Sequence, residues 1–220
     1  MVSPSILLTG FEPFGGEALN PSALVAQALH GQRIGEATVQ AVCLPCVFGL
    51  ARERLLDALS AVRPRLVVCL GQAGGREGIT VERVAINVDD ARIPDNAGQR
   101  PVDTPVVPGA PAAHFSSLPI KAVVAALQQA GWPASVSQTA GTYVCNHVFY
   151  ALMHALRRRR GVRGGFIHLP YLPGQAGASA GASAGAPSLA LDDQIAAVRL
   201  ALQTAWATRT DLLASGGAES

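Results

Sequence analysis

An unbroken run of five apolar residues, Leu66–Leu70, lies between Pro64 and Gly71. A strand with one face in water would alternate apolar and polar residues, so such a run indicates a central strand buried on both faces. Other short apolar runs, bounded by glycine and proline, alternate with longer stretches of helical period. This alternation is typical of helices covering both faces of a mainly parallel, twisted sheet. We therefore expect one α/β domain over residues 1–220, built as a three-layer α/β/α sandwich.

Start and stop residues sharpen the boundaries of the expected elements. Asn20 before Pro21 indicates a helix start, because asparagine accepts hydrogen bonds from free amides and proline suits the first helical position. Residues 89–119 are rich in proline and have no clear period, so we expect them to border the active site. Residues 174–187 contain a tandem GASA repeat, which is typical of a flexible surface loop. Expected strands span 5–9, 38–44, 66–70, 79–88, 135–139 and 166–169, and expected helices span 21–30, 50–62, 120–130, 145–160 and 192–207.

The charge balance excludes several classes of protein. Seventeen Lys and Arg residues against fifteen Asp and Glu leave a net charge of +2, too little for a nucleic-acid or anionic-membrane surface. The sequence has neither a signal peptide nor an apolar segment of the roughly 20 residues that span a bilayer. Four scattered cysteines do not make the disulfide framework of a small secreted domain. We expect a cytoplasmic protein without nucleic-acid or membrane partners, and a small neutral ligand.

Cys145 is the most informative of the four thiols, because it lies at the start of an expected helix. The free amides of a helix N-terminus can lower the pKa of a cysteine and can hold an oxyanion. The alternative is a small buried apolar residue, the commoner role of a free cysteine. Cys43 and Cys46 form a C-x-x-C pair, but they fall in or beside a strand and no second pair of metal ligands accompanies them. We expect these two and Cys69 to be structural, and we expect no metal site.

A cysteine nucleophile needs a base and a group that orients the base. His168 is the best-placed candidate base, at the carboxyl end of an expected strand, although a strand histidine alone is more often a hydrogen-bonded core residue. His147, two residues after Cys145 on the same helix, is expected around its far side. Glu82 shares a face of the expected strand 79–88 with apolar residues, and a carboxylate on such a face needs a partner.

Two glycine-containing segments are further candidates for a binding site. Residues 71–75 follow a strand but lack the G-x-G-x-x-G spacing and a Walker lysine, so they give little support for a nucleotide site. Phe11 and Phe14 lie after the first strand in a sequence with only 5% aromatic residues. They either wall an apolar pocket or pack beneath their own loop.

Four segments occur in an order that resembles one known family. They are GFEPFGG followed by NPS, GQAGGREGITVERVAINVDDARIPDN, TAGTYVCNHVFY, and GFIHLPYLP. Together they are similar to the signature segments of pyroglutamyl peptidase I, or pyrrolidone carboxyl peptidase, a family of cysteine peptidases. The resemblance runs from about residue 6 to residue 173 and extends more loosely to the last expected helix.

The resemblance implies both an activity and the residues that carry it. It implies hydrolysis of the bond after an N-terminal pyroglutamate by a triad of Cys145, His168 and Glu82, with no metal or organic cofactor. It also implies that the protein binds peptides with an N-terminal pyroglutamate and forms a homo-oligomer, often a tetramer. The implied site residues beyond the triad are Arg92 beside the oxyanion, Phe11, Phe14, Tyr143 and Val144 around the lactam ring, and Asn20 and the Gln72 backbone as polar contacts.

Chemical reasoning agrees with this implied mechanism. Cys145 would attack the pyroglutamyl carbonyl, His168 would take up and return the proton, and Glu82 would fix the imidazole. The pyroglutamyl group is neutral, flat and small, so it suits an apolar pocket with a few hydrogen bonds. The alternative is a non-catalytic or nucleoside-handling binding domain of the same architecture, since fold does not fix function. The joint presence of the three triad residues favours the peptidase.

Overall fold

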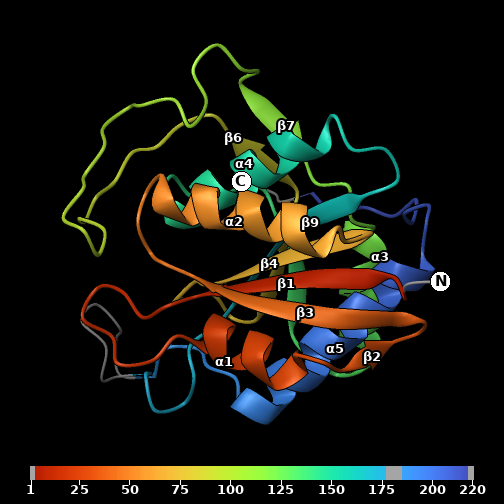
Figure 1. Ribbon diagram of the computed structural model, residues 1–220. Helices are drawn as coiled ribbons and strands as arrows, with labels where there is room; N and C mark the ends of the chain where they lie inside the picture. The colour runs from red at the N-terminus through yellow and green to blue at the C-terminus, as the bar shows by residue number, and fades with distance from the viewer. Residues whose placement is uncertain (1–2, 177–184, 218–220) are drawn as a thin grey trace.

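The computed structural model describes residues 3–176 and 185–217, in which one mixed sheet is covered by helices (Figure 1). Its seven strands lie in the order β2-β3-β1-β4-β9-β5-β8, and β6 and β7 form a separate small sheet. The strands are β1 (Ser5–Phe11), β2 (Arg33–Ile34), β3 (Ala37–Leu44), β4 (Leu66–Gln72), β5 (Ile79–Glu82), β6 (Val84–Ile86), β7 (Ala113–Phe115), β8 (Ala134–Ser137) and β9 (Arg163–Leu169). The helices are α1 (Pro21–Leu29), α2 (Leu50–Val62), α3 (Ile120–Gln129), α4 (Val144–Leu156) and α5 (Leu191–Ala207).

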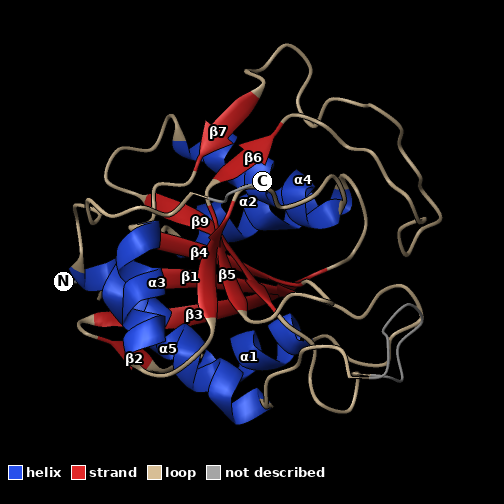
Figure 2. Cartoon of the chain, turned by 180° about the vertical axis from the view of Figure 1, so that it is seen from behind, coloured by secondary structure: helices blue, strands red, loops and turns tan. Residues whose placement is uncertain are grey.

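The layers match the α/β architecture expected from the sequence. Strands β3, β1, β4 and β9 are parallel to one another, whereas β5 and β8 run in the opposite direction, since β5 is antiparallel to β9. Helices α1, α3 and α5 cover one face of the sheet, and α2 and α4 cover the other (Figure 2). The expected fold class, a mainly parallel sheet flanked by helices, is confirmed.

The central strands are buried on both faces. On β1, Ile6 and Leu8 pack in the core beneath α1 and α5, while Leu7 packs in the core beneath α2 and α4. Every residue of β4 is buried in the same alternating way. Burying one such side chain contributes about 1.5–3 kcal/mol to stability. The apolar runs are unbroken because alternate side chains of each strand enter the two cores on opposite faces of the sheet.

The expected strand 79–88 is wrong as a single element. The structure divides it at Arg83 into β5, inside the main sheet, and β6, which pairs with β7. The strand β7 lies within residues 89–119, where none was expected. The buried amide of Asn146 on α4 is hydrogen-bonded to β6: it accepts from the Ile86 N–H and donates to the Ile86 carbonyl. Glu82 therefore ends β5 and does not share a strand face with Val84.

Other differences concern the ends of elements. Helix α4 ends at Leu156, so the arginines 157–160 lie beyond it, where Arg159 donates to the Leu59 carbonyl. Most of the GASA segment, residues 177–184, lies outside the described residues, and its flexibility stays a prediction. Among the described residues, no helix is long and apolar enough to cross a membrane.

Candidate active site

The thiol of Cys145 rests directly on the main sheet. Cys145 is the second residue of α4, and its sulfur contacts Gly71 near the carboxyl end of β4. A Cβ atom at residue 71 would lie 2.8 Å from the Cys145 Sγ atom and 2.8 Å from the ring of Phe166. Only glycine leaves room for the sulfur to pack this closely against the backbone of β4. The glycine that follows the apolar run of β4 therefore determines where the thiol lies.

The imidazole of His168 lies on the neighbouring strand at the same level. His168 on β9 pairs in register with Gly71 on β4. Both residues face α4, because Cys69 and Phe166, two positions earlier on each strand, belong to the core on that side. The structure thus brings the thiol of Cys145 and the imidazole of His168 together at the carboxyl ends of two central strands.

Glu82 completes the group from the antiparallel strand β5. Its Oε1 atom lies 2.7 Å from the Nδ1 atom of His168, and the two side chains are 0% and 4% exposed. A carboxylate accepts only, so Nδ1 carries a proton and Nε2 of the neutral ring has a free lone pair. That nitrogen is the one able to take a proton from a thiol. The three residues that the sequence singled out as a triad are therefore adjacent in space.

Burial sets the charge state of the group. It lowers the pKa of His168, an effect that the hydrogen bond and charge of Glu82 only partly oppose. Burial on its own would raise the pKa of Glu82, but His168, the Ser137 hydroxyl and Arg76 outweigh it and the pKa is lowered. The free enzyme at neutral pH thus holds an ionised carboxylate beside a neutral imidazole.

Burial favours the neutral form of the Cys145 thiol. Burial raises the pKa of Cys145, and the nearby Cys46 and Glu82 raise it further. The sequence led us to expect a pKa lowered by the helix N-terminus, and the structure gives the opposite direction because the thiol is packed against Gly71 and Phe166. A reaction at this sulfur would therefore need a base to take up the thiol proton.

The aromatic residues expected around a ligand divide into two kinds. Phe11 and Val144 are buried in the core beneath α4, and the Phe11 ring packs on that of Phe166. Phe14 and Tyr143 are partly exposed, and their ring centroids lie 5.9 Å apart. Phe48, which the sequence did not indicate, packs edge-on against Tyr143. Phe14 and Tyr143 are thus exposed enough to contact a ligand, whereas Phe11 and Val144 lie in the core.

Asn20 and Gln72 are buried and already hydrogen-bonded within the protein. The Asn20 side chain accepts from the N–H and the hydroxyl of Ser22 and donates to the Glu12 carbonyl, so it caps α1 as expected. The Gln72 side chain accepts from the amide of Gln175, which also donates to the Leu19 carbonyl. These contacts join the loops that follow β1, β4 and β9 around the same edge of the sheet.

Comparisons with known proteins point to a single family. The model of the pyroglutamyl peptidase family matches residues 4–208. A pyrrolidone-carboxylate peptidase of Enterobacter sp. (strain 638) is 58% identical over 213 residues, covering 97% of this chain and 98% of the relative. One of Klebsiella pneumoniae (strain 342) is 61% identical over 200 residues, covering 91% of this chain and 90% of the relative.

The crystal structure of pyroglutamyl peptidase I from Bacillus amyloliquefaciens superposes with a TM-score of 0.92, at 45% identity, covering 97% of this chain and all of that one. A mutant pyrrolidone carboxyl peptidase from Pyrococcus furiosus gives 0.87 at 42% identity, covering 92% and 98% of the two chains. The chain belongs to the pyroglutamyl peptidase family. The resemblance of the four segments is thus confirmed over nearly the whole length.

Within this pyroglutamyl peptidase fold, Arg92 is the expected site residue with the least direct support. Its side chain is exposed, and no hydrogen bond or ion pair joins it to another described residue. Its loop is nevertheless tied to the start of α4, since the Asp90 N–H donates to the Thr142 carbonyl and the Tyr143 hydroxyl donates to the Pro94 carbonyl. The loop therefore lies beside the segment that leads into Cys145, and the role of Arg92 stays a prediction.

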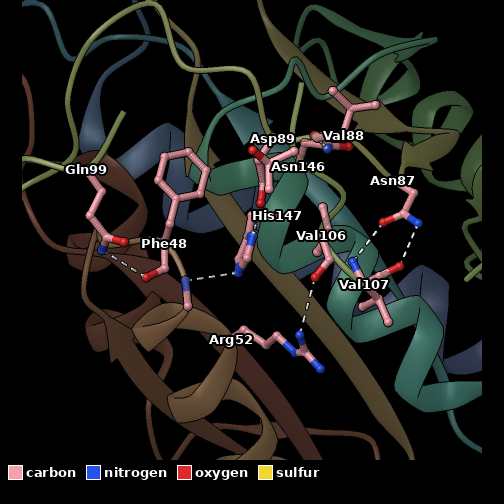
Figure 3. Close-up of polar contacts among 12 residues, drawn as sticks. Phe48, Arg52, Asn87, Val88, Asp89, Gln99, Val106, Val107, Asn146 and His147 are labelled. Carbon is pink, nitrogen blue, oxygen red and sulfur yellow. Dashed lines mark hydrogen bonds and ion pairs between the residues drawn. The ribbon is translucent and has the colours of Figure 1, made fainter. Parts of the chain in front are cut away.

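A second polar cluster, around Asn146 and His147 of α4, was missed in the sequence (Figure 3). His147 lies with its Nδ1 atom 2.8 Å from Asp89 Oδ2, while its Nε2 atom accepts a hydrogen bond from the Gly49 N–H. The ring thus faces α2 and the 89–107 loop, away from the sheet on which Cys145 rests. Asn146 and His147 anchor the segments flanking α4, a role that local sequence does not indicate because every partner is distant in sequence.

Arg76 is the other missed residue. Its guanidinium lies 2.6 Å from Glu82 Oε1, the same oxygen that His168 contacts. The sequence placed Glu82 on an apolar face and required a partner for it, and an arginine just before the strand was the available signal. The described residues contain no group of three or more metal-ligating side chains close enough to hold a metal ion.

Proposed function

We propose that this protein is a cysteine exopeptidase that removes N-terminal pyroglutamate from peptides, with Cys145 as nucleophile, His168 as general base and acid, and Glu82 as the residue that orients the imidazole. The observation that carries the proposal is the packing of the Cys145 sulfur over Gly71, directly beside the His168–Glu82 pair. Its high similarity to proteins named pyrrolidone-carboxylate peptidase supports the choice of substrate.

Acylation begins with the substrate bound and the thiol still protonated. The sulfur attacks the pyroglutamyl carbonyl carbon as its proton passes to Nε2 of His168, and the carbonyl oxygen becomes an oxyanion. The unpaired amides of the first turn of α4 would donate to this oxygen, with Arg92 as a further donor. The carbon–nitrogen bond then breaks, the imidazolium protonates the departing amine, and a pyroglutamyl thioester remains on Cys145.

Deacylation uses the same groups in reverse. His168 takes a proton from a water molecule, whose oxygen attacks the thioester carbon. The carbon–sulfur bond breaks, the thiol regains its proton from the imidazolium, and 5-oxoproline leaves. Glu82 remains ionised throughout and stabilises the imidazolium in both halves. No step requires a metal or an organic cofactor.

Recognition of the lactam would rest on shape and a few hydrogen bonds. Phe14 and Tyr143 would contact the faces of the ring, with Phe11 and Val144 beneath them. The backbone of Gln72 and the loop before α1, which ends at the cap residue Asn20, would supply polar groups to the lactam amide. A prolyl substrate has the same ring but lacks the ring carbonyl, so it would leave such groups unpaired and be rejected.

The decisive experiment compares a pyroglutamyl-linked fluorogenic amide with its prolyl analogue. We expect turnover of the first only, loss of turnover in Cys145→Ala and Cys145→Ser, and normal turnover in the control Cys43→Ser, whose thiol is exposed on β3. Activity of the Ala variant would exclude the mechanism. Equal turnover of both substrates would exclude the proposed specificity.

Assembly and location remain predictions. A homotetramer is what the family resemblance implies, and sedimentation velocity of the purified chain tests it. A cytoplasmic location fits four free cysteines in the described residues.

A further inference from the structure

The guanidinium of Arg76 joins three parts of the active site. Its Nη1 atom donates to Glu82 Oε1 at 2.6 Å and to the hydroxyl of Thr80, and its Nη2 atom donates to the Thr139 carbonyl at 3.0 Å. Thr80 is the residue that pairs with His168 across the sheet. Thr139 lies in the connection from β8 to α4 that leads to Cys145. The Arg76 side chain is thus hydrogen-bonded to the carboxylate of Glu82, to the strand beside His168 and to the segment that leads to Cys145.

The charge of Arg76 matters because the pair beside it is buried. An ionised Glu82 with a neutral His168 carries a net charge of −1 in a region closed to water, and such a pair takes up a proton readily. Arg76 brings the local charge to zero without adding a proton. Its position at the edge of the sheet, with 26% of its side chain exposed, lets the arginine remain solvated while it reaches Glu82.

We propose that Arg76 is a positioning residue of the catalytic site: it holds Glu82 against His168 and supplies the positive charge that keeps the pair from taking up a proton at neutral pH. The inference rests on the proposed roles of Cys145, His168 and Glu82. It adds the reason why His168 is free to accept the thiol proton, since a base that is already protonated cannot do so.

The groups that act on the pair come from each neighbouring element. Arg76 belongs to the β4–β5 loop, Cys145 comes from α4, and the hydroxyl of Ser137 comes from β8. Arg76 lowers the pKa of both Glu82 and His168, in addition to the effects of burial and of their mutual hydrogen bond. Among these groups only Arg76 is a permanent cation, so its removal has a predictable sign.

The test is the pH profile of kcat/KM for hydrolysis of a pyroglutamyl amide. In Arg76→Ala the acidic limb of this profile moves to higher pH, because the pKa of His168 rises when the cation is removed. The ratio of wild-type to variant kcat/KM is therefore about tenfold larger at pH 6 than at pH 8. The matched control is Arg83→Gln, which removes a cation one residue from Glu82. The Arg83 guanidinium donates to the Gly216 carbonyl and makes no hydrogen bond or ion pair with Glu82 or His168, so the control keeps the wild-type limb.

Chemical rescue separates charge from packing. A cavity of about 430 Å³, lined by Arg76, Glu77 and Thr80 with residues of β8, opens beside the guanidinium and admits a small ion. Guanidinium chloride at millimolar concentration restores the low-pH activity of Arg76→Ala, whereas urea, its neutral analogue, does not. An acidic limb that stays at the wild-type pH, or equal rescue by urea, overturns the inference.

Two further measurements keep the outcomes distinct. If Arg76→Ala does not fold, Arg76→Lys replaces it. The limb stays in place because the charge remains, and kcat falls because a single ammonium nitrogen lacks the planar fork whose two nitrogens separately reach Glu82 and Thr139. A displaced limb or an unchanged kcat in that variant contradicts the inference. A wild-type limb that persists in His168→Gln, in contrast, refutes the proposed base, on which the inference rests, whereas a wild-type limb in Arg76→Ala refutes only the role of Arg76.

Discussion

A single methyl group at residue 71 should disable the enzyme without unfolding it. In Gly71→Ala the new carbon would lie 2.8 Å from the Cys145 sulfur, whereas ordinary contact is 3.4–4 Å. Since the Phe166 ring blocks the other side, also at 2.8 Å, the sulfur must move by roughly 0.6–1.2 Å, the difference between these distances. A misplacement of about 1 Å can cost 10²-fold in rate, equivalent to about 2.7 kcal/mol of transition-state stabilisation.

The assay is kcat/KM on a pyroglutamyl amide together with the melting temperature. Overpacking a core lowers the free energy of unfolding by about 1–3 kcal/mol. Each kcal/mol lowers the melting temperature by about 2–4 °C for a domain of this size. Gly164→Ala is the matched control: it also sits on the main sheet, and its methyl would lie 2.8 Å from Leu156, far from the nucleophile. The control should lose a similar amount of stability and keep its activity.

Two results would refute this reasoning. Wild-type kcat/KM in folded Gly71→Ala would mean that the position of the sulfur over β4 does not matter for catalysis. An equal loss of activity in Gly164→Ala would mean that general loosening of the sheet, and not displacement of the thiol, explains the effect.

Three further outcomes follow from the same contacts. Removal of the Asn20 cap in Asn20→Ala should cost about 0.5–2 kcal/mol of stability and raise KM more than it lowers kcat, as measured by denaturant titration and kinetics, because the loop before α1 loses its support. The His147→Ala variant leaves Asp89 without its 2.8 Å partner and should unfold about 1–3 kcal/mol more easily, whereas a wild-type urea midpoint would contradict the role given to this pair. Because the pKa of His168 is lowered in the folded state, the imidazole takes up a proton at higher pH in the unfolded chain than in the folded one. The free energy of unfolding should therefore fall as the pH drops below about 6.5. The variant His168→Gln should weaken that pH dependence, as measured by thermal scans.

Patterns that depend on neighbouring residues predicted much of the fold. The apolar run 66–70 identified β4 as central, and Asn20–Pro21 located the start of α1, because burial on two faces and helix capping are both local. The pairing of Glu82 with a histidine 86 residues away was also predicted. That prediction came from the family resemblance together with an apolar strand face that contained one unexplained carboxylate.

Contacts made only by tertiary packing could not be predicted in the same way. The strand 79–88 reads as continuous, and its division at Arg83 depends on the amide of Asn146, 60 residues from Ile86. The pKa of Cys145 was expected to fall because helix position is visible in a sequence, whereas the burial that raises it is not. Arg76 was not predicted as a site residue, because neither its hydrogen bond to Thr139 nor its ion pair with Glu82 follows from sequence spacing alone.

The reversed direction of β5 explains how one active site obtains both its carboxylate and its cation. Parallel strands β4 and β9 bring Gly71 and His168 to the carboxyl edge of the sheet. Because β5 runs the other way, its beginning lies at that edge, and Thr80 pairs with His168 while Glu82 falls two residues deeper, beneath the imidazole. Arg76 precedes β5 and therefore stands at the same edge, close enough to reach Glu82 from the solvent side. A parallel β5 would begin at the opposite edge and carry this arginine away from the base, so the antiparallel strand is what allows a buried carboxylate to be neutralised by a solvated charge.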